Sequence, residues 1–132
     1  MNSPEIRFVV GLLTTILLLV LVMWTGKRRA RRAHITLVVT AVAALGVTIY
    51  FAERLGEVYD IRAAGVITPI HLFLAKLTTA FYLAPITTGI LTLRRAKVVR
   101  YHRWAAYTVL TLTVVTAGTG TAMILLAEPL LS

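Results

Sequence analysis

The sequence predicts an all-α integral membrane protein, a four-helix up-and-down bundle with both termini on the outer side of the membrane. The first observation is composition, because 58% of the 132 residues are apolar and the mean hydropathy is +0.84, above the range of soluble domains. The second is that four apolar stretches are each about as long as a helix needs to cross the hydrocarbon core of a bilayer. They cover residues 8–24, 35–51, 67–93 and 104–127. We treat residues 1–132 as one transmembrane domain.

The third observation is the placement of charge. The chain has 14 Lys and Arg against 5 Asp and Glu, a net charge of +9, which in a soluble protein would favour a nucleic-acid partner. The first connection holds Lys27, Arg28, Arg29, Arg31 and Arg32, and the third holds Arg94, Arg95, Lys97, Arg100 and Arg103. By the positive-inside rule both connections face the cytoplasm. The expected partner is therefore the lipid of the cell inner (plasma) membrane, and no nucleic acid.

The first stretch, residues 8–24, predicts a retained helix and not a cleaved signal peptide. A signal peptide carries its positive charge before the apolar core, whereas here the cluster KRRARR follows it. The chain has no cysteine, which excludes structural disulfides and thiolate metal sites.

The second and fourth stretches place small and hydroxyl residues at four-residue intervals. In the second these are Thr36, Thr40, Ala44 and Thr48, and in the fourth they are Thr113, Ala117 and Thr121. Small residues allow two membrane helices to approach closely, and hydroxyls bond across the contact. AGTGTA in the fourth stretch is accordingly interpreted as a packing surface, because it lacks the strand, lysine and spacing of a phosphate loop.

The third stretch, residues 67–93, combines two prolines and a lysine. Pro69 suits a first helical turn, whereas Pro85 lies inside the stretch and removes the backbone bond to the carbonyl of Phe81, so we expect a bend there. Lys76 lies roughly 12 Å into the helix at 1.5 Å per residue. At that depth a cation either extends to the interface or takes a buried partner, which makes Lys76 a candidate buried charge.

His34 and His102 begin the second and fourth stretches from the same face of the membrane. In an up-and-down bundle these helices are diagonal, and residues at matched height can face each other through the middle. Two such imidazoles could supply both axial ligands of a haem iron, or bind another metal ion. Arginines suit the haem propionates, and the candidates are Arg100, Arg103, Arg31 and Arg32. The alternative is that both histidines are solvated polar residues that bind nothing.

His71 enters the membrane from the opposite face and is a candidate outer-side metal ligand. It cannot share an iron with His34 and His102 unless its helix is displaced. Lys76 follows five residues later, and residues five apart diverge on a regular helix.

Two segments, RRAHITLVVTAVAALGVTIYFAER and RYHRWAAYTVLTLTVVTAGTGTAMILL, make the chain resemble a four-helix bacterial membrane family of formerly unknown function. That family includes an assembly factor needed for the maturation of some haem–copper terminal oxidases. Its pattern has a basic loop and a histidine opening one helix, an arginine-rich loop ending in His-Arg, and a Thr-Gly near the end of the last helix. His34, His102 with Arg103, and Thr119 with Gly120 match it, and the resemblance spans roughly residues 31–126.

The chain departs from the family pattern at two places. In ungapped register on His102, the family's third-helix histidine falls at Lys76 and not at His71. The aromatic-rich motif of the last helix is replaced by TLTVVTAGT. A weaker resemblance, resting on His34, His71 and His102, is to b561-type membrane cytochromes, which place histidines near the ends of a four-helix core.

The resemblance implies a protein of the respiratory membrane that assists haem–copper oxidase assembly by binding haem, a metal ion or the oxidase subunit itself. The alternatives are a b-type electron carrier and a non-catalytic accessory subunit of a larger complex. Haem b is the favoured cofactor, copper is less favoured, and a chain without cofactor stays open. No catalytic residue is assigned, because the sequence lacks a Ser/His/Asp triad, paired acids around a water site and zinc-protease spacing.

Overall fold

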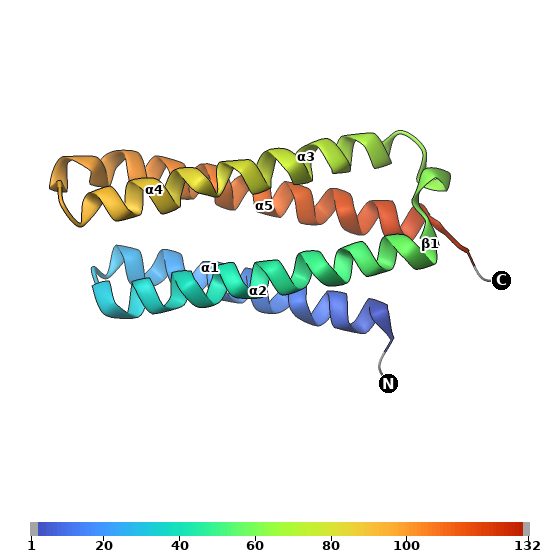
Figure 1. Ribbon diagram of the computed structural model, residues 1–132, viewed down its shortest axis with the longest axis horizontal. Helices are drawn as coiled ribbons and strands as arrows, with labels where there is room; N and C mark the ends of the chain where they lie inside the picture. The colour runs from blue at the N-terminus through green and yellow to red at the C-terminus, as the bar shows by residue number, and fades with distance from the viewer. Residues whose placement is uncertain (1–2, 131–132) are drawn as a thin grey trace. The chain divides into compact units, whose positions relative to one another are not determined.

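The computed structural model describes residues 3–130, and its long elements are all helices (Figure 1). They are α1 (Pro4–Lys27), α2 (Arg31–Val58), α3 (Ile67–Phe81), α4 (Leu83–Thr92) and α5 (Val99–Leu126). Two 3-10 turns, η1 (Ile61–Ala64) and η2 (Ala96–Val98), precede α3 and α5. Two-residue strands, β1 (Tyr59–Asp60) and β2 (Glu128–Pro129), pair in a small sheet.

Four helical segments among the described residues are long and apolar enough to cross a membrane. α1 and α2 provide two of them, α3 with α4 provides the third (Ile67–Thr92), and η2 with α5 provides the fourth (Ala96–Leu126). The expectation of an all-α chain with four helical segments of membrane-spanning length and composition is therefore confirmed, while the up-and-down topology stays a prediction. Which terminus lies on which side of the membrane stays a prediction.

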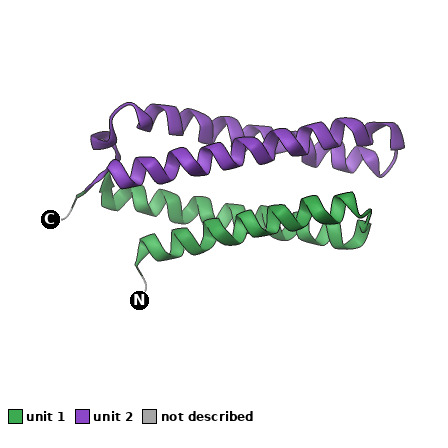
Figure 2. Cartoon of the chain, turned by 180° about the vertical axis from the view of Figure 1, so that it is seen from behind, with its two compact units in different colours: residues 1–60, 129–132 green, residues 61–128 purple. Residues whose placement is uncertain are grey.

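The described residues divide into two compact units (Figure 2). Unit 1 is the antiparallel hairpin of α1 and α2 with the C-terminal residues from Pro129, and the N–H of Leu130 donates to the carbonyl of Val58. Unit 2 runs from Ile61 to Glu128, and in it α5 packs along both α3 and α4.

The helices extend beyond the apolar stretches from which they were predicted. α1 begins at Pro4, where the Ser3 side chain accepts the N–H of Ile6 at 3.3 Å and caps the first turn. α2 continues to Val58 through a charged turn in which Arg54 donates to Glu57 at 2.9 Å. Apolar boundaries mark where lipid begins, whereas capping and charge pairs determine where a helix ends.

The interruption expected near Pro85 is present. α3 ends at Phe81 and α4 begins at Leu83. Pro85 has no N–H to donate to the carbonyl of Phe81. The helical pattern resumes at once, because the N–H of Ile86 donates to the carbonyl of Tyr82 at 3.4 Å.

Hydroxyl groups connect α1 to α2 inside unit 1. The Oγ1 atoms of Thr15 and Thr48 lie 3.0 Å apart and both side chains are buried. Each hydroxyl also approaches a carbonyl of its own helix at 2.8 Å, Thr15 that of Gly11 and Thr48 that of Ala44. A Cβ on Gly11 would lie 2.9 Å from the Oγ1 of Thr48, so the glycine is what allows the helices to approach this closely.

The contact surface expected on α2 is only partly present. Thr48 is buried, but Thr36 and Thr40 are exposed, and the buried residues of α2 are Ala41, Thr48 and Leu55. Steps of four residues turn by about 400°, so a four-residue series drifts around the helix, whereas steps of seven nearly return to the same face. The sequence pattern therefore included Thr48 but missed Ala41 and Leu55, which lie seven residues to either side of it.

The same kind of contact connects the helices of unit 2. The Oγ1 atoms of Thr78 and Thr116 are 2.8 Å apart, which links α3 to α5. Tyr82, at the interruption between α3 and α4, places its hydroxyl 2.8 Å from the Oγ1 of Thr113. These contacts link α5 to α3 and to the residue between α3 and α4. The positions of the two histidines of this unit depend on this packing.

Candidate functional site

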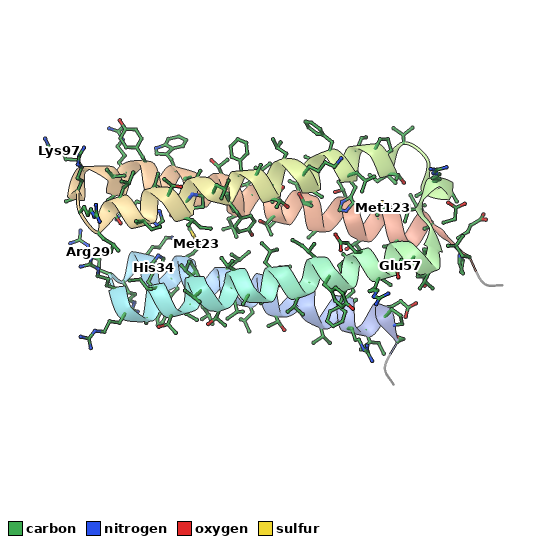
Figure 3. The ribbon with its side chains drawn as sticks, in the orientation of Figure 1. Met23, Arg29, His34, Glu57, Lys97 and Met123 are labelled. Atoms are coloured by element: carbon green, nitrogen blue, oxygen red, sulfur yellow. The ribbon has the colours of Figure 1, made fainter. Side chains whose placement is uncertain are left out.

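His34 lies in the first turns of α2, close to the turn that carries Arg29 (Figure 3). Its Nδ1 lies 2.9 Å from the carbonyl oxygen of Val22 and 3.3 Å from the Oγ1 of Thr25, both on α1. A Cβ on Gly26 would lie 3.2 Å from the Cε1 of His34. The imidazole therefore rests against the last turns of α1 through Nδ1 and Cε1.

His102 occupies the equivalent position in unit 2, in the first turns of α5. Its Nδ1 lies 3.2 Å from the Oγ1 of Thr88 on α4. A Cβ on Gly89 would lie 3.2 Å from the Cε1 of His102. The connection between α4 and α5 includes η2, whose Lys97 lies at the turn of the hairpin (Figure 3).

His71 makes this contact in the reverse order along the chain, because the histidine comes first, on α3, and its partners follow on α5. Its Nδ1 lies 3.1 Å from the Oγ1 of Thr119. A Cβ on Gly120 would lie only 2.7 Å from the Cε1 of His71. This is the closest of the three approaches.

Each histidine thus meets a Thr-Gly dipeptide on a neighbouring helix of its own unit, which we call a Thr-Gly pair. The chain has three histidines and three Thr-Gly dipeptides, and they match one to one. The pairs are Thr25–Gly26 with His34, Thr88–Gly89 with His102, and Thr119–Gly120 with His71.

The threonine hydroxyls define the direction of these bonds. A hydroxyl has one hydrogen to donate. Each of the three donates it to a carbonyl of its own helix: Thr25 to Leu21 at 2.9 Å, Thr88 to Ala84 at 2.7 Å and Thr119 to Thr116 at 3.0 Å. With that hydrogen donated, each Oγ1 offers the imidazole a lone pair, which favours the hydrogen on Nδ1 of the histidine. In the neutral imidazole the lone pair is consequently on Nε2.

That protonation state is the one in which a histidine binds a metal through Nε2. Metal-binding histidines usually donate their other ring N–H to a carbonyl or another acceptor, which fixes the tautomer and the ring orientation. His34 does so most directly, because the carbonyl of Val22 can only accept. The donor set present therefore fits haem iron or another imidazole-binding metal. Among the described residues, no group of three or more His, Asp or Glu side chains is arranged to hold a metal ion.

The structure separates the two histidines of unit 2. His102 and Thr119, the partner of His71, both lie on α5, which rises about 25 Å between them at 1.5 Å per residue. They cannot share one ion, as expected. His34 belongs to unit 1 and His102 to unit 2, and the expectation that their rings face each other stays a prediction.

The charged candidates lie on the outside of the helices. Arg100 and Arg103 are exposed in the first turns of α5, and their role toward haem propionates stays a prediction. Lys76, expected as a candidate buried charge, is exposed on α3. The reason is helical geometry, because Lys76 follows His71 by five residues and cannot share the face through which His71 meets α5.

Sequence reasoning missed four of the six residues in the Thr-Gly pairs. Thr119 and Gly120 entered through the packing surface AGTGTA and through the family resemblance, whereas Thr25, Gly26, Thr88 and Gly89 did not enter at all. The available signal was the equal number of histidines and Thr-Gly dipeptides. Two of the pairs also precede their histidine across a basic connection.

Comparison of the chain with protein-family models, with curated proteins and with solved structures finds no match in any of the three. The class of protein is defined by the fold and the site alone. It is a multi-pass membrane protein in which each histidine contacts, through Nδ1, a threonine on a neighbouring helix of its own unit. Membership of a particular family stays a prediction.

Proposed function

We propose that this membrane protein holds haem b, or a metal ion, through histidine Nε2 atoms and thereby assists the assembly of a haem–copper oxidase in the respiratory membrane. The observation that carries the proposal is the contact of His34 with Val22. Since a carbonyl can only accept, Nδ1 is the donor, and in the neutral imidazole Nε2 then bears the lone pair. A surface histidine that served only as a polar residue would not require this bond.

His34 and His102 are the proposed axial ligands, with Arg100 and Arg103 near the propionates. The two histidines are held by the same kind of contact in two separate hairpins. A pair of matched neutral imidazoles is the donor set of a low-spin b-type haem. When bound, haem supplies one-electron chemistry at its iron, while the chain binds, orients and shields the group.

The role in oxidase assembly is supported by the resemblance carried by His34, His102 with Arg103, and Thr119 with Gly120. Such a role requires binding and transfer of a group or a partner subunit, and no catalytic turnover. The proposed partner is a terminal oxidase subunit that receives the haem or metal.

A b-type electron carrier is the second candidate function, and His71 favours it. This histidine is held in the same way near the opposite end of unit 2 from His102. Ligands at both ends of a transmembrane unit are what a chain needs in order to move electrons between the two surfaces of a membrane.

The first experiment is the reduced-minus-oxidised optical spectrum of the protein purified in mild detergent, together with metal analysis. We expect Soret and alpha bands that are lost in His34→Ala and in His102→Ala and retained in Lys76→Ala, which alters an exposed residue. A colourless protein with no stoichiometric metal contradicts both ligand functions. A second experiment separates them: loss of the chain from cells should lower haem–copper oxidase activity if it assists assembly, with oxidase subunits co-purifying.

A further inference from the structure

We infer that the three Thr-Gly pairs are positioning residues that fix the protonation state and the orientation of the histidines. The threonine hydroxyl accepts from Nδ1, for His34 together with the carbonyl of Val22, and the glycine gives the ring room to reach it. Any consequence for ligand binding rests on the proposed function. The effect on the imidazole itself does not, and it can be measured without a ligand.

The threonine part of the inference follows from the hydrogen-bond directions. Thr25, Thr88 and Thr119 each donate to a carbonyl of their own helix at 3.0 Å or less. A hydroxyl that is occupied in this way presents a lone pair to the adjacent imidazole. Of the two neutral tautomers of the imidazole, only the one protonated at Nδ1 can donate a hydrogen bond from Nδ1 to that lone pair.

The glycine part follows from close approach. Added Cβ atoms at Gly26, Gly89 and Gly120 would meet the Cε1 of a histidine at 3.2, 3.2 and 2.7 Å. By contrast, Gly46 and Gly118, also in membrane helices, have no atom within 4 Å of an added Cβ. A ring therefore rests on the helix at each of these three glycines, and at Gly120 an added Cβ would force the His71 ring to shift.

The contact between a histidine and a Thr-Gly pair occurs three times, which argues against an accident of packing. The pairs lie on three different helices, α1, α4 and α5. For His34 and His102 the pair precedes the histidine, whereas for His71 it follows. A duplicated hairpin would explain the first two contacts but not the third, which reaches the same arrangement in the opposite chain order.

The inference assigns Thr119–Gly120 a role that differs from packing between helices. Thr78 with Thr116 and Tyr82 with Thr113 already link α5 to α3 and to the residue between α3 and α4 without a histidine. Removal of the His71 contact should therefore change the imidazole while leaving unit 2 folded.

The test is the ¹⁵N spectrum of the ligand-free protein with labelled histidine, in detergent at about pH 8.5, well above the usual histidine pKa of ~6.5. Three histidines give three sets of signals, which single His→Gln variants assign. All three should show protonated Nδ1 and unprotonated Nε2. Wild-type protein in which His71 or His102 is mainly protonated at Nε2 overturns the inference.

The variants separate positioning from packing. Gly120→Ala should displace His71 and abolish its Nδ1–H signal while the other two histidines are unchanged, and Gly118→Ala is the matched control two residues away. Thr88→Val should weaken the Nδ1–H signal of His102 and Thr88→Ser should restore it, with the exposed Thr87→Val as control. Circular dichroism confirms that helix content is retained.

The outcomes distinguish this inference from the proposed function. An unchanged His71 signal in Gly120→Ala, with helix content retained, overturns the inference whether or not haem binds. Nδ1-protonated histidines in a protein that takes up no haem or metal support the inference and contradict the ligand function.

Discussion

The Nδ1 of His71 on α3 lies 3.1 Å from the Oγ1 of Thr119 on α5, and His102 on α5 makes the matching contact with Thr88 on α4 at 3.2 Å. α5 thus receives a histidine near one end and contributes a histidine near the other. Both contacts lie within unit 2, so the orientation of each ring depends on how this one helix packs against α3 and α4.

The first prediction concerns Gly11, which lies against Thr48 where α1 packs on α2. Gly11→Ala should lower the free energy of unfolding by about 1–3 kcal/mol, the usual range for overpacking, because its Cβ would lie 2.9 Å from the Oγ1 of Thr48. Gly46→Ala is the control, since nothing lies within 4 Å of its added Cβ. It should be neutral or stabilising by up to about 1 kcal/mol. Reversible unfolding in detergent measures both, and equal effects would show that Gly11 has no packing role.

The second prediction concerns the hydroxyl pair of Thr15 and Thr48. A double-mutant cycle with Thr15→Val and Thr48→Val should give a coupling free energy of about 0.5–1.5 kcal/mol, as hydrogen bonds between membrane helices do, since the two Oγ1 atoms lie 3.0 Å apart and are buried.

A control cycle pairs Thr15→Val with Thr40→Val, because Thr40 is exposed and bonds only to its own helix at the carbonyl of Thr36. Its coupling should be close to zero. Equal coupling in the two cycles would mean that the Thr15–Thr48 bond contributes nothing specific.

The sequence was sufficient for the helices but not for the contacts of the histidines. Apolar length predicted the four membrane segments, and Pro85 predicted a bend close to Tyr82, where the structure has a break between α3 and α4. These features depend on local chemistry, which a single segment carries in full. The histidine contacts depend on which turn of one helix meets which turn of another. Neither the sequence around His71 on α3 nor the sequence around Thr119 on α5 specifies that register by itself.

The third prediction concerns Lys76, whose side chain is exposed on α3. Lys76→Leu should leave the stability of the protein in detergent unchanged or raise it, because the substitution removes a cation from an apolar helix without removing a partner. Thermal unfolding of the wild type and the variant measures the difference, with Lys76→Arg as the charge-retaining control. A loss of several kcal/mol in Lys76→Leu alone would indicate a buried ion pair.

The fourth prediction concerns pH and Tyr59, which follows α2 outside its membrane-spanning segment. The hydroxyl of Tyr59 donates to the Oε1 of Glu5 at 3.0 Å, and this bond raises the pKa of Tyr59 above its ordinary value of 10.0. The folded-state pKa is raised, so the stabilisation is complete below about pH 10 and is lost as pH rises through the folded pKa. Tyr59→Phe should therefore be less stable than the wild type at neutral pH, and the difference should disappear at high pH.

Phenolate absorbance, taken as wild type minus Tyr59→Phe, should show one tyrosine that ionises above pH 10. Ionisation of that tyrosine at or below its ordinary pKa would contradict the bond to Glu5.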